Sequence, residues 1–231
     1  LVDRPYQDII RNMKDSVLNL LQKNHISMDQ CIGIGIGSPG TVDAEKGEIV
    51  YSNNFDWNNI PLSKELNSMI NLPIRVSNDA NCAALGETVI GAAKGFKNVI
   101  LLTLGTGVGG GIILNGKIFE GGHAGGAELG HTTIREGGEF CTCGRKGCFE
   151  AYASASALIR DTKRAAEQYP DSIIHELCNH KLDQINGIVP FDAAAKDDPA
   201  GLEVVNNYIK YLSEGIINMV NIFRPDKVLL S

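Results

Sequence analysis

One histidine and three cysteines that could bind a metal ion together lie within eighteen residues of this chain. These residues are His131, Cys141, Cys143 and Cys148. One imidazole and three thiolates are a common ligand set of closed, tetrahedral zinc sites. Gly144 and Gly147 allow the tight turn that would bring the last two sulfurs to one ion. The alternative is three buried or disulfide-paired cysteines beside an unrelated histidine. The Cys-x-Cys spacing is poor for mutual pairing, so the sequence favours zinc.

Two carboxylates flank this zinc motif. Glu128 lies three residues before the histidine, and Glu150 lies two residues after the last cysteine. A closed zinc site is complete with four ligands, so neither carboxylate is needed to hold the ion. Their positions indicate that the zinc supports a ligand site close by.

A glycine-rich stretch directly follows an apolar run over 99–104. It begins with Gly105-Thr106-Gly107 and ends with three further glycines, at Gly111. Backbone N–H groups in such a stretch can face an anion, as they do in phosphate-binding nests. Neither a P-loop nor a dinucleotide fingerprint fits, because no Gly-Lys-Ser/Thr and no helix follows. The stretch is equally consistent with a glycine-rich hairpin that needs unusual dihedral angles.

Two further polar turns follow predicted strands. Asn78 and Asp79 stand at the carboxyl end of one strand and open a helix, which is where open α/β sheets place ligand contacts. The alternative is that they only cap the helix. Gly40 lies in a turn after another strand and could offer backbone groups to a polar ligand.

The elements that would position these residues alternate between strands and helices, which predicts an α/β fold. The three isoleucines Ile32, Ile34 and Ile36 predict one apolar strand face. Asn115-Gly116 predicts a two-residue hairpin turn. Helices are expected at 8–22, 62–70, 80–93, 151–168, 173–178 and 201–222. Strands are expected at 31–37, 74–77, 99–104, 112–114, 117–119 and 227–231.

The composition of the 231 residues limits the classes of function. A formal net charge of −6 argues against a nucleic-acid surface, because no positive field attracts phosphate. The three cysteines outside the zinc motif occur singly, a pattern that suits the reducing cytoplasm. The chain shows neither a signal peptide nor an apolar run of the ~20 residues that a membrane helix requires. We therefore expect a cytoplasmic protein without a membrane partner.

Several motifs together resemble one family. The pattern Glu-x-Gly-His followed by Cys-x-Cys-Gly-x-x-Gly-Cys-x-Glu resembles the signature of the ROK family, which contains repressors, open reading frames and sugar kinases. The resemblance extends through the stretches that begin at Ile36, Asn78 and Leu104, and it covers nearly all the chain. It is strongest to the bacterial glucokinases of that family.

The resemblance implies an actin-like, hexokinase-type (ribonuclease H-like) fold of two lobes that binds ATP. Residues 1–103 would form the remainder of the N-terminal lobe. Residues 104–231 would form the C-terminal lobe, with the zinc loop at 131–148. Family kinases begin with an Asp-x-Gly-Gly-Thr loop, which these residues lack, and continue beyond 227–231 into a segment beside adenine. We therefore expect both ends of the ATP site to be absent, and little or no phosphorylation by residues 1–231 alone.

The resemblance also implies roles for particular residues. Asp79 would be the general base for the sugar hydroxyl that is phosphorylated. The turn Gly105, Thr106 and Gly107 would contact ATP phosphates, with Mg²⁺ as the second cofactor beside structural Zn²⁺. The sugar would be held by Gly40, Asn78, Asp79, Glu128, His131 and Glu150.

The function that this resemblance implies is a glucose 6-kinase that forms a homodimer. The alternatives are a kinase for N-acetylmannosamine, N-acetylglucosamine, mannose or fructose, a sugar-responsive repressor, and a sugar-binding module without catalysis. Asn53 and Asn54 are expected near the sugar.

Overall fold

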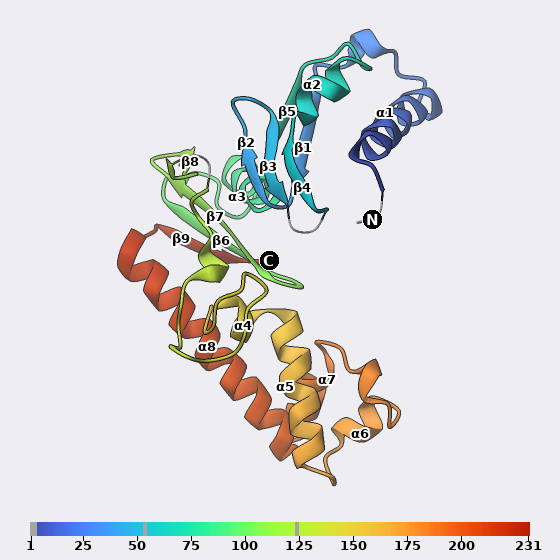
Figure 1. Ribbon diagram of the computed structural model, residues 1–231. Helices are drawn as coiled ribbons and strands as arrows, with labels where there is room; N and C mark the ends of the chain where they lie inside the picture. Colours follow the sequence, from blue (N-terminus) through green and yellow to red (C-terminus); the bar gives the residue numbers. More distant parts are fainter. Residues whose placement is uncertain (1–3, 53–54, 123–124) are drawn as a thin grey trace. The chain divides into compact units, whose positions relative to one another are not determined.

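The computed structural model describes residues 4–52, 55–122 and 125–231 (Figure 1). The prediction for Asn53 and Asn54 lies outside these residues. The described helices are α1 (Tyr6–Lys23), α2 (Leu62–Asn67), α3 (Asp79–Val89), α4 (Glu150–Ala153), α5 (Ala155–Gln168), α6 (Ile174–Leu177), α7 (Val189–Ala194) and α8 (Pro199–Phe223). The described strands are β1 (Ile34–Ser38), β2 (Thr41–Asp43), β3 (Glu48–Ser52), β4 (Trp57–Ile60), β5 (Ile74–Asn78), β6 (Val99–Leu104), β7 (Val108–Leu114), β8 (Lys117–Ile118) and β9 (Lys227–Leu230).

The chain divides into two compact units. The first comprises residues 1–95 and 111–127, and the second comprises residues 96–110 and 128–231. The boundary falls inside β7, which begins in the second unit and ends in the first. The lobe boundary expected after residue 103 concerns the complete fold and stays a prediction.

A shared apolar core holds the first unit together. The unit contains a parallel pair of strands, β1 and β5, and an antiparallel sheet of order β2-β3-β4. The core contains Ile10 of α1, Ile49 of β3, Leu62 of α2 and Val76 of β5, each at most 2% exposed. Burying one such side chain contributes about 1.5–3 kcal/mol. The apolar faces of α1 and α2 therefore hold these helices on the strands.

The parallel pairing of β1 with β5 aligns the carboxyl ends of both strands. Ser38 lies opposite Asn78, so the turn after β1 and the start of α3 lie at the same edge. The prediction that Ile32 shares a covered face with Ile34 and Ile36 is wrong. The pairing begins at Ile34, and Ile32, which precedes the strand, is 97% exposed.

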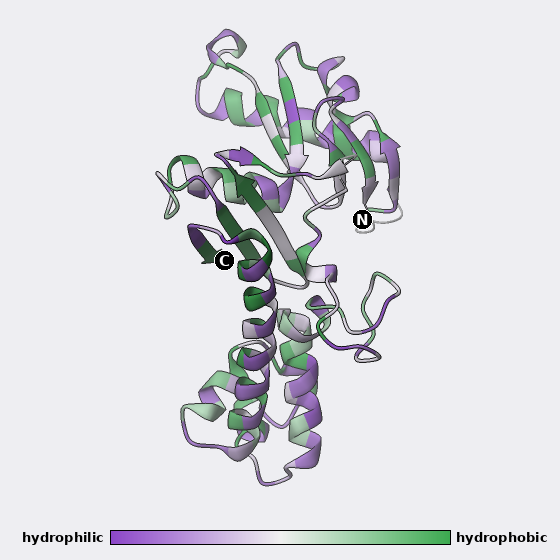
Figure 2. Ribbon diagram, turned by 90° about the vertical axis from the view of Figure 1, so that its left-hand side faces the viewer, coloured by the Kyte–Doolittle hydropathy of each residue, from purple (hydrophilic) through white to green (hydrophobic). Residues whose placement is uncertain are grey.

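Strand β6 is the most deeply buried strand of the sheet whose order is β8-β7-β6-β9. Its Val99, Ile100, Leu101 and Leu102 are at most 2% exposed, as the apolar sequence predicts, and the strand is strongly apolar in Figure 2. Strand β9 pairs with β6 in parallel, which confirms the strand predicted at the end of the chain.

Strand β7 shortens the predicted glycine loop. The strand begins at Val108, so Gly109–Gly111 belong to it, contrary to the prediction. The last of these glycines packs against α3, where a Cβ would overlap Ala84. The hairpin between β7 and β8 is confirmed. Asn115 and Gly116 have φ values of 52° and 77°, as a type I′ turn requires.

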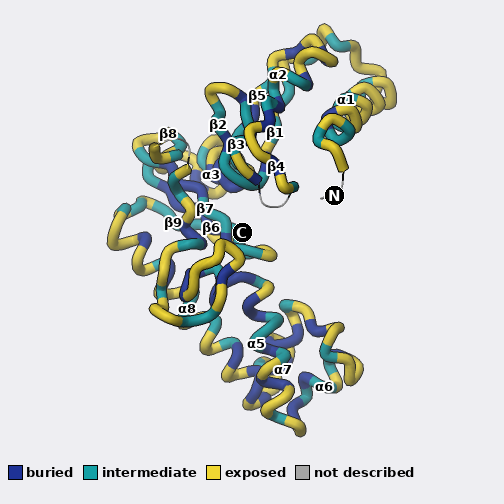
Figure 3. The backbone as a smooth tube through the Cα atoms, in the orientation of Figure 1, coloured by how far each residue is buried: buried dark blue, intermediate teal, exposed yellow. Residues whose placement is uncertain are grey.

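Helices α4, α5 and α7 pack against α8, whose residues alternate between buried and exposed along its length, and α6 packs against α7 (Figure 3). The helix predicted over 151–168 is divided at Ser154, because the hydroxyl of this residue caps α5 by accepting a hydrogen bond from the Ala157 N–H at 3.1 Å. Gly215 of α8 leaves room for the fully buried ring of Phe149. Within the described residues, no helix has the length and apolar character that crossing a membrane requires.

Candidate functional site

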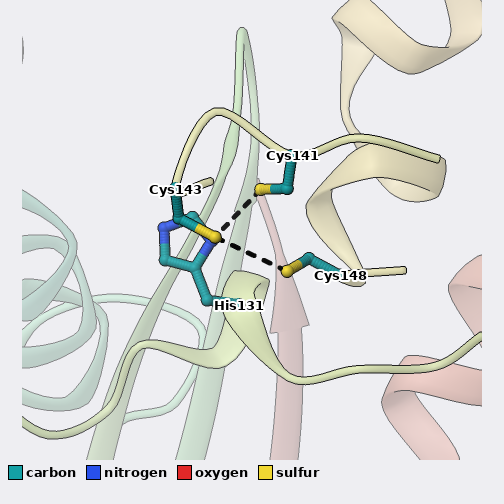
Figure 4. Close-up of side chains that lie close together, drawn as sticks. All are labelled: His131, Cys141, Cys143 and Cys148. Atoms are coloured by element: carbon teal, nitrogen blue, oxygen red, sulfur yellow. Dashed lines mark hydrogen bonds between the residues drawn. The ribbon is translucent and has the colours of Figure 1, made fainter. Parts of the chain in front are cut away.

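The four predicted metal ligands converge in the second unit (Figure 4). Their ligand atoms all lie within 4.8 Å of one another. The distance from His131 Nδ1 to Cys141 Sγ is 3.5 Å, and the distance from Cys143 Sγ to Cys148 Sγ is 3.7 Å. A tetrahedral zinc ion with bonds of about 2.0 Å to nitrogen and about 2.3 Å to sulfur would separate such pairs by about 3.5 and 3.8 Å. The geometry of these ligands therefore fits zinc.

Glycines and a small apolar cluster shape the loop that carries the cysteines. Gly144 and Gly147 have φ values of 86° and 80°, in the region that favours glycine. A Cβ on Gly147 would also overlap the carbonyl oxygen of Arg135. Cys141 and Cys148 are buried in a cluster with Ala151 and Tyr152 on α4, and the partly buried Ile134 and Tyr211 pack against it. Backbone turns and packing thus preform the site, as the positions of the glycines predict.

The thiols experience different surroundings. Burial, with a smaller contribution from the neighbouring Glu150 carboxylate, raises the pKa of the Cys141 thiol to about 12. Burial would also raise the pKa of Cys143, but a hydrogen bond from the Arg145 N–H and contacts with the other sulfurs outweigh it and lower that pKa. Burial raises the pKa of Cys148. Because metal ligands are thiolates, a bound cation would supply the positive charge that the buried sulfurs need.

Glu150 links the metal loop to the glycine turn. Its Oε1 accepts a hydrogen bond from the Thr142 hydroxyl at 3.1 Å and lies 3.4 Å from Cys141 Sγ. Its Oε2 accepts a hydrogen bond from the Val108 N–H at 3.0 Å. A Cβ on Gly107 would overlap this carboxylate, so the turn approaches it closely. Both oxygens of Glu150 are therefore engaged within its own unit.

The turn at 105–107 presents two free donors. The Gly105 carbonyl accepts a hydrogen bond from the Ala155 N–H at 2.9 Å, and the Thr106 carbonyl accepts one from the Ser156 hydroxyl at 2.7 Å. In a trans peptide the C=O and the following N–H point in opposite directions. The N–H groups of Thr106 and Gly107 therefore point away from α5, and within the described chain neither has an acceptor. Two adjacent free N–H groups are donors of the kind that an anion can accept hydrogen bonds from.

The two other predicted sugar ligands of the second unit, Glu128 and His131, lie at a short 3-10 turn, Leu129–His131. Glu128 precedes this turn, and its carbonyl accepts a hydrogen bond from the His131 N–H at 3.0 Å. The Glu128 side chain is exposed, whereas Leu129 and Gly130 are buried and anchor the turn. Gly130 is required because a Cβ would overlap the Val108 carbonyl oxygen.

The first unit brings together the other three predicted site residues. The Asn78 side chain caps α3 by accepting a hydrogen bond from the Asn81 N–H, and it donates one to the Gly40 carbonyl at 3.1 Å. Asn78 therefore caps the helix and also stands at the carboxyl end of β5, so the two alternatives considered for this residue are compatible. Asp79 is exposed, and its Oδ1 accepts a hydrogen bond from the Ala80 N–H at 2.8 Å.

The predicted site residues do not include Thr142, Ala155 and Ser156, whose polar groups hold Glu150 and the glycine turn. The Ser-x-Ser pattern at 154–156 signals a helix start, but only the folded chain shows what the second hydroxyl contacts.

The fold and the site define a class of protein: an α/β chain of the actin-like, hexokinase-type fold, with a His-Cys₃ cluster that could hold a metal ion beside a glycine turn. The ROK family model matches residues 1–231, and the chain belongs to the ROK family.

Similar proteins include both enzymes and regulators. A glucokinase from Halalkalibacterium halodurans is 39% identical over 96% of this chain and 67% of its own length. A xylose repressor from Bacillus subtilis is 34% identical over 94% of this chain and 53% of its own length. The crystal structure of a ROK family glucokinase from Streptomyces griseus in complex with glucose and AMPPNP has a TM-score of 0.81 and 32% identity, with 96% of this chain and 71% of that one covered. The chain thus spans about half to about seven tenths of these relatives.

Proposed function

We propose that this chain is part of an ATP-dependent kinase that phosphorylates the 6-hydroxyl of glucose. The observation that carries the proposal is the position of Asp79, at the carboxyl end of β5 and the first turn of α3, beside the amide of Asn78. The likeness to a glucokinase over 96% of the chain supports glucose as the substrate.

Asp79 supplies the proton acceptor in the proposed reaction. Only its Oδ1 is used by the Ala80 N–H, which leaves Oδ2 for a sugar hydroxyl. Accepting the hydroxyl proton as the oxygen attacks phosphorus contributes typically 10²–10⁴-fold. The Asn78–Gly40 hydrogen bond holds the neighbouring turn in place.

The nucleotide is proposed to bind at the turn Gly105, Thr106 and Gly107. Phosphoryl transfer depends mainly on alignment and charge neutralisation, and the free N–H groups of Thr106 and Gly107 offer both to phosphate oxygens. Mg²⁺ binds chiefly through nucleotide phosphates and water, with one or two protein carboxylates. AMPPNP is an ATP analogue, so the nucleotide in the Streptomyces griseus complex supports ATP as the donor.

Amide, carboxylate and imidazole groups are proposed to hold the sugar. Amides and carboxylates bind a neutral, hydroxyl-rich ring without a basic pocket. Structural zinc would fix the loop of His131, whose second ring nitrogen would be a donor for a sugar oxygen. The proposed sugar ligands are Gly40, Asn78, Asp79, Glu128, His131 and Glu150.

The decisive test is the substitution Asp79→Asn in the full-length polypeptide that carries this chain. We expect turnover with ATP, Mg²⁺ and glucose to fall by about 10²–10⁴-fold, while glucose still binds in calorimetry. Asp171→Asn, at an exposed turn, is the matched control. Undiminished phosphorylation by the Asp79 variant would remove the general-base role. A panel with N-acetylmannosamine, N-acetylglucosamine, mannose and fructose tests the choice of sugar.

A sugar-responsive repressor is the second candidate. The 34% identity to a xylose repressor over 94% of the chain favours it, because the same sugar-binding residues would serve either role. The full-length polypeptide would then bind sugar without phosphorylating it, and it would bind operator DNA through residues outside this acidic region.

We also propose a homodimer that acts in the cytoplasm. Exposed apolar residues on α8, including Ile209, Ile217 and Ile222, offer an interface. The six cysteines are free, which suits a reducing compartment where thiolates stay available for zinc. Sedimentation equilibrium measures the oligomeric state.

A further inference from the structure

The seven-residue segment from Glu150 to Ser156 contacts both the metal loop and the glycine turn. It begins two residues after the buried ligand Cys148 and includes all of α4 and the start of α5. Both structures that it touches belong to the same unit as the segment itself.

Contacts on the metal side fix the Glu150 carboxylate. Thr142, which lies between two metal ligands in the sequence, donates its hydroxyl hydrogen to Oε1, and Cys141 Sγ lies 3.4 Å from the same oxygen. When the loop is ordered around an ion, these groups hold the carboxylate in one orientation. When the loop is loose, this restraint is lost.

Contacts on the turn side fix the backbone that offers the free N–H groups. Glu150 Oε2 accepts the Val108 N–H, and the Ser156 hydroxyl donates to the Thr106 carbonyl. Because the two groups of one peptide point in opposite directions, holding the Thr106 carbonyl also aims the Gly107 N–H. The orientation of both donors thus depends on residues that follow the metal loop.

We propose that Glu150 and Ser156 are positioning residues for the nucleotide, and that Glu150 couples occupancy of the metal site to nucleotide affinity. The inference rests on the proposed nucleotide site at 105–107 and adds a dependence between two ligands. Thermodynamic linkage makes this dependence reciprocal, so ADP must tighten zinc binding by the same factor by which zinc tightens ADP binding.

The expected factor is about tenfold, within the range of about 5–150-fold that is usual for coupled sites. Glu150→Ala removes the link, so the factor falls to about one. Glu150→Gln keeps an oxygen that can accept the Val108 N–H, so it retains most of the factor. Ser156→Ala weakens ADP binding but leaves the factor unchanged, because Ser156 has no described contact with the metal loop.

The test uses the full-length polypeptide with ADP, Mg²⁺ and no sugar, so that any role of Glu150 in sugar binding has no influence. Calorimetry gives the ADP dissociation constant of zinc-loaded and chelator-treated protein. Competition with a chromophoric chelator gives the zinc affinity with and without ADP. Glu167→Gln and Ser213→Ala, both at exposed helix positions, are the matched controls.

Hydrogen exchange at the Thr106 and Gly107 amides gives a second readout that does not need bound nucleotide. We expect faster exchange after zinc removal and in Glu150→Ala, at unchanged far-UV circular dichroism. Equal ADP affinity with and without zinc, or full coupling in Glu150→Ala, would overturn the coupling and leave the kinase proposal intact. Failure of ADP to bind either form would overturn the nucleotide site as well.

Discussion

Two glycines in the metal loop allow a quantitative test of how the backbone preforms the site. Gly144 and Gly147 both have positive φ values, so alanine at either position costs about 1–2 kcal/mol of backbone strain. They differ in their surroundings. A Cβ on Gly144 meets nothing within 4 Å, whereas a Cβ on Gly147 would overlap the Arg135 carbonyl oxygen. Relieving an overlap with backbone adds about 1–3 kcal/mol.

The expected result is therefore a difference between two chemically identical substitutions. Gly144→Ala should weaken zinc binding by about 5- to 30-fold, because 1.4 kcal/mol corresponds to tenfold. Gly147→Ala should weaken it by at least a further fivefold, and it should lower the free energy of unfolding of the zinc-loaded protein by about 2–5 kcal/mol.

Competition with a chelator of known affinity measures the first quantity, and urea unfolding in excess zinc measures the second. Gly95→Ala is a useful control, since this glycine also has positive φ and open surroundings but lies in the other unit. It should affect unfolding and leave zinc affinity unchanged. Equal losses for Gly144→Ala and Gly147→Ala would refute the argument from crowding.

Two further predictions concern the stability of the second unit. Chelation of the metal should lower its melting temperature, and Zn²⁺ but not Mg²⁺ should restore it, because folding and binding of a thiolate site are coupled; scanning calorimetry checks this. Burial alone would raise the pKa of Asp198, but hydrogen bonds from the Gly201 N–H, the Ser172 hydroxyl and the Ile173 N–H outweigh it and lower that pKa. The stabilisation from Asp198 is thus present above the ordinary carboxyl pKa and lost as pH falls through the lowered value. Unfolding at pH 7 should show Asp198→Ala less stable by about 1–3 kcal/mol, and the difference should shrink in acid.

The metal site could be predicted because its information is local. Four ligands and two turn glycines occupy 131–148, so residue type and spacing alone restrict the geometry. The Asn115-Gly116 hairpin was predictable for the same reason, because two adjacent residues determine the turn.

The sheet formed by β2, β3 and β4 was not predicted. These strands have three to five residues, and β4 carries two exposed asparagines between buried ends instead of an alternating pattern. Asn59 even has a positive φ of 50° within that strand. Pairing with β3 stabilises β4 despite its weak local preference, and pairing of this kind leaves little trace in the sequence.

The contacts that hold the glycine turn could not be predicted from the sequence either. Ser156 and Thr106 are fifty residues apart, and Glu150 and Val108 are forty-two apart. A residue type can show that a hydroxyl is available, but the packing of α5 decides which carbonyl it reaches.

Gly215 makes the middle of α8 a socket for the ring of Phe149, which stands in the sequence between the sulfur of Cys148 and the carboxylate of Glu150. A methyl group at this point would displace the ring, and with it the residues on either side. The contact between Gly215 and Phe149 thereby couples the rotation of this 25-residue helix to the position of the metal loop. A substitution or a second subunit that rotates or shifts this helix would therefore displace Phe149, and with it Cys148 and Glu150.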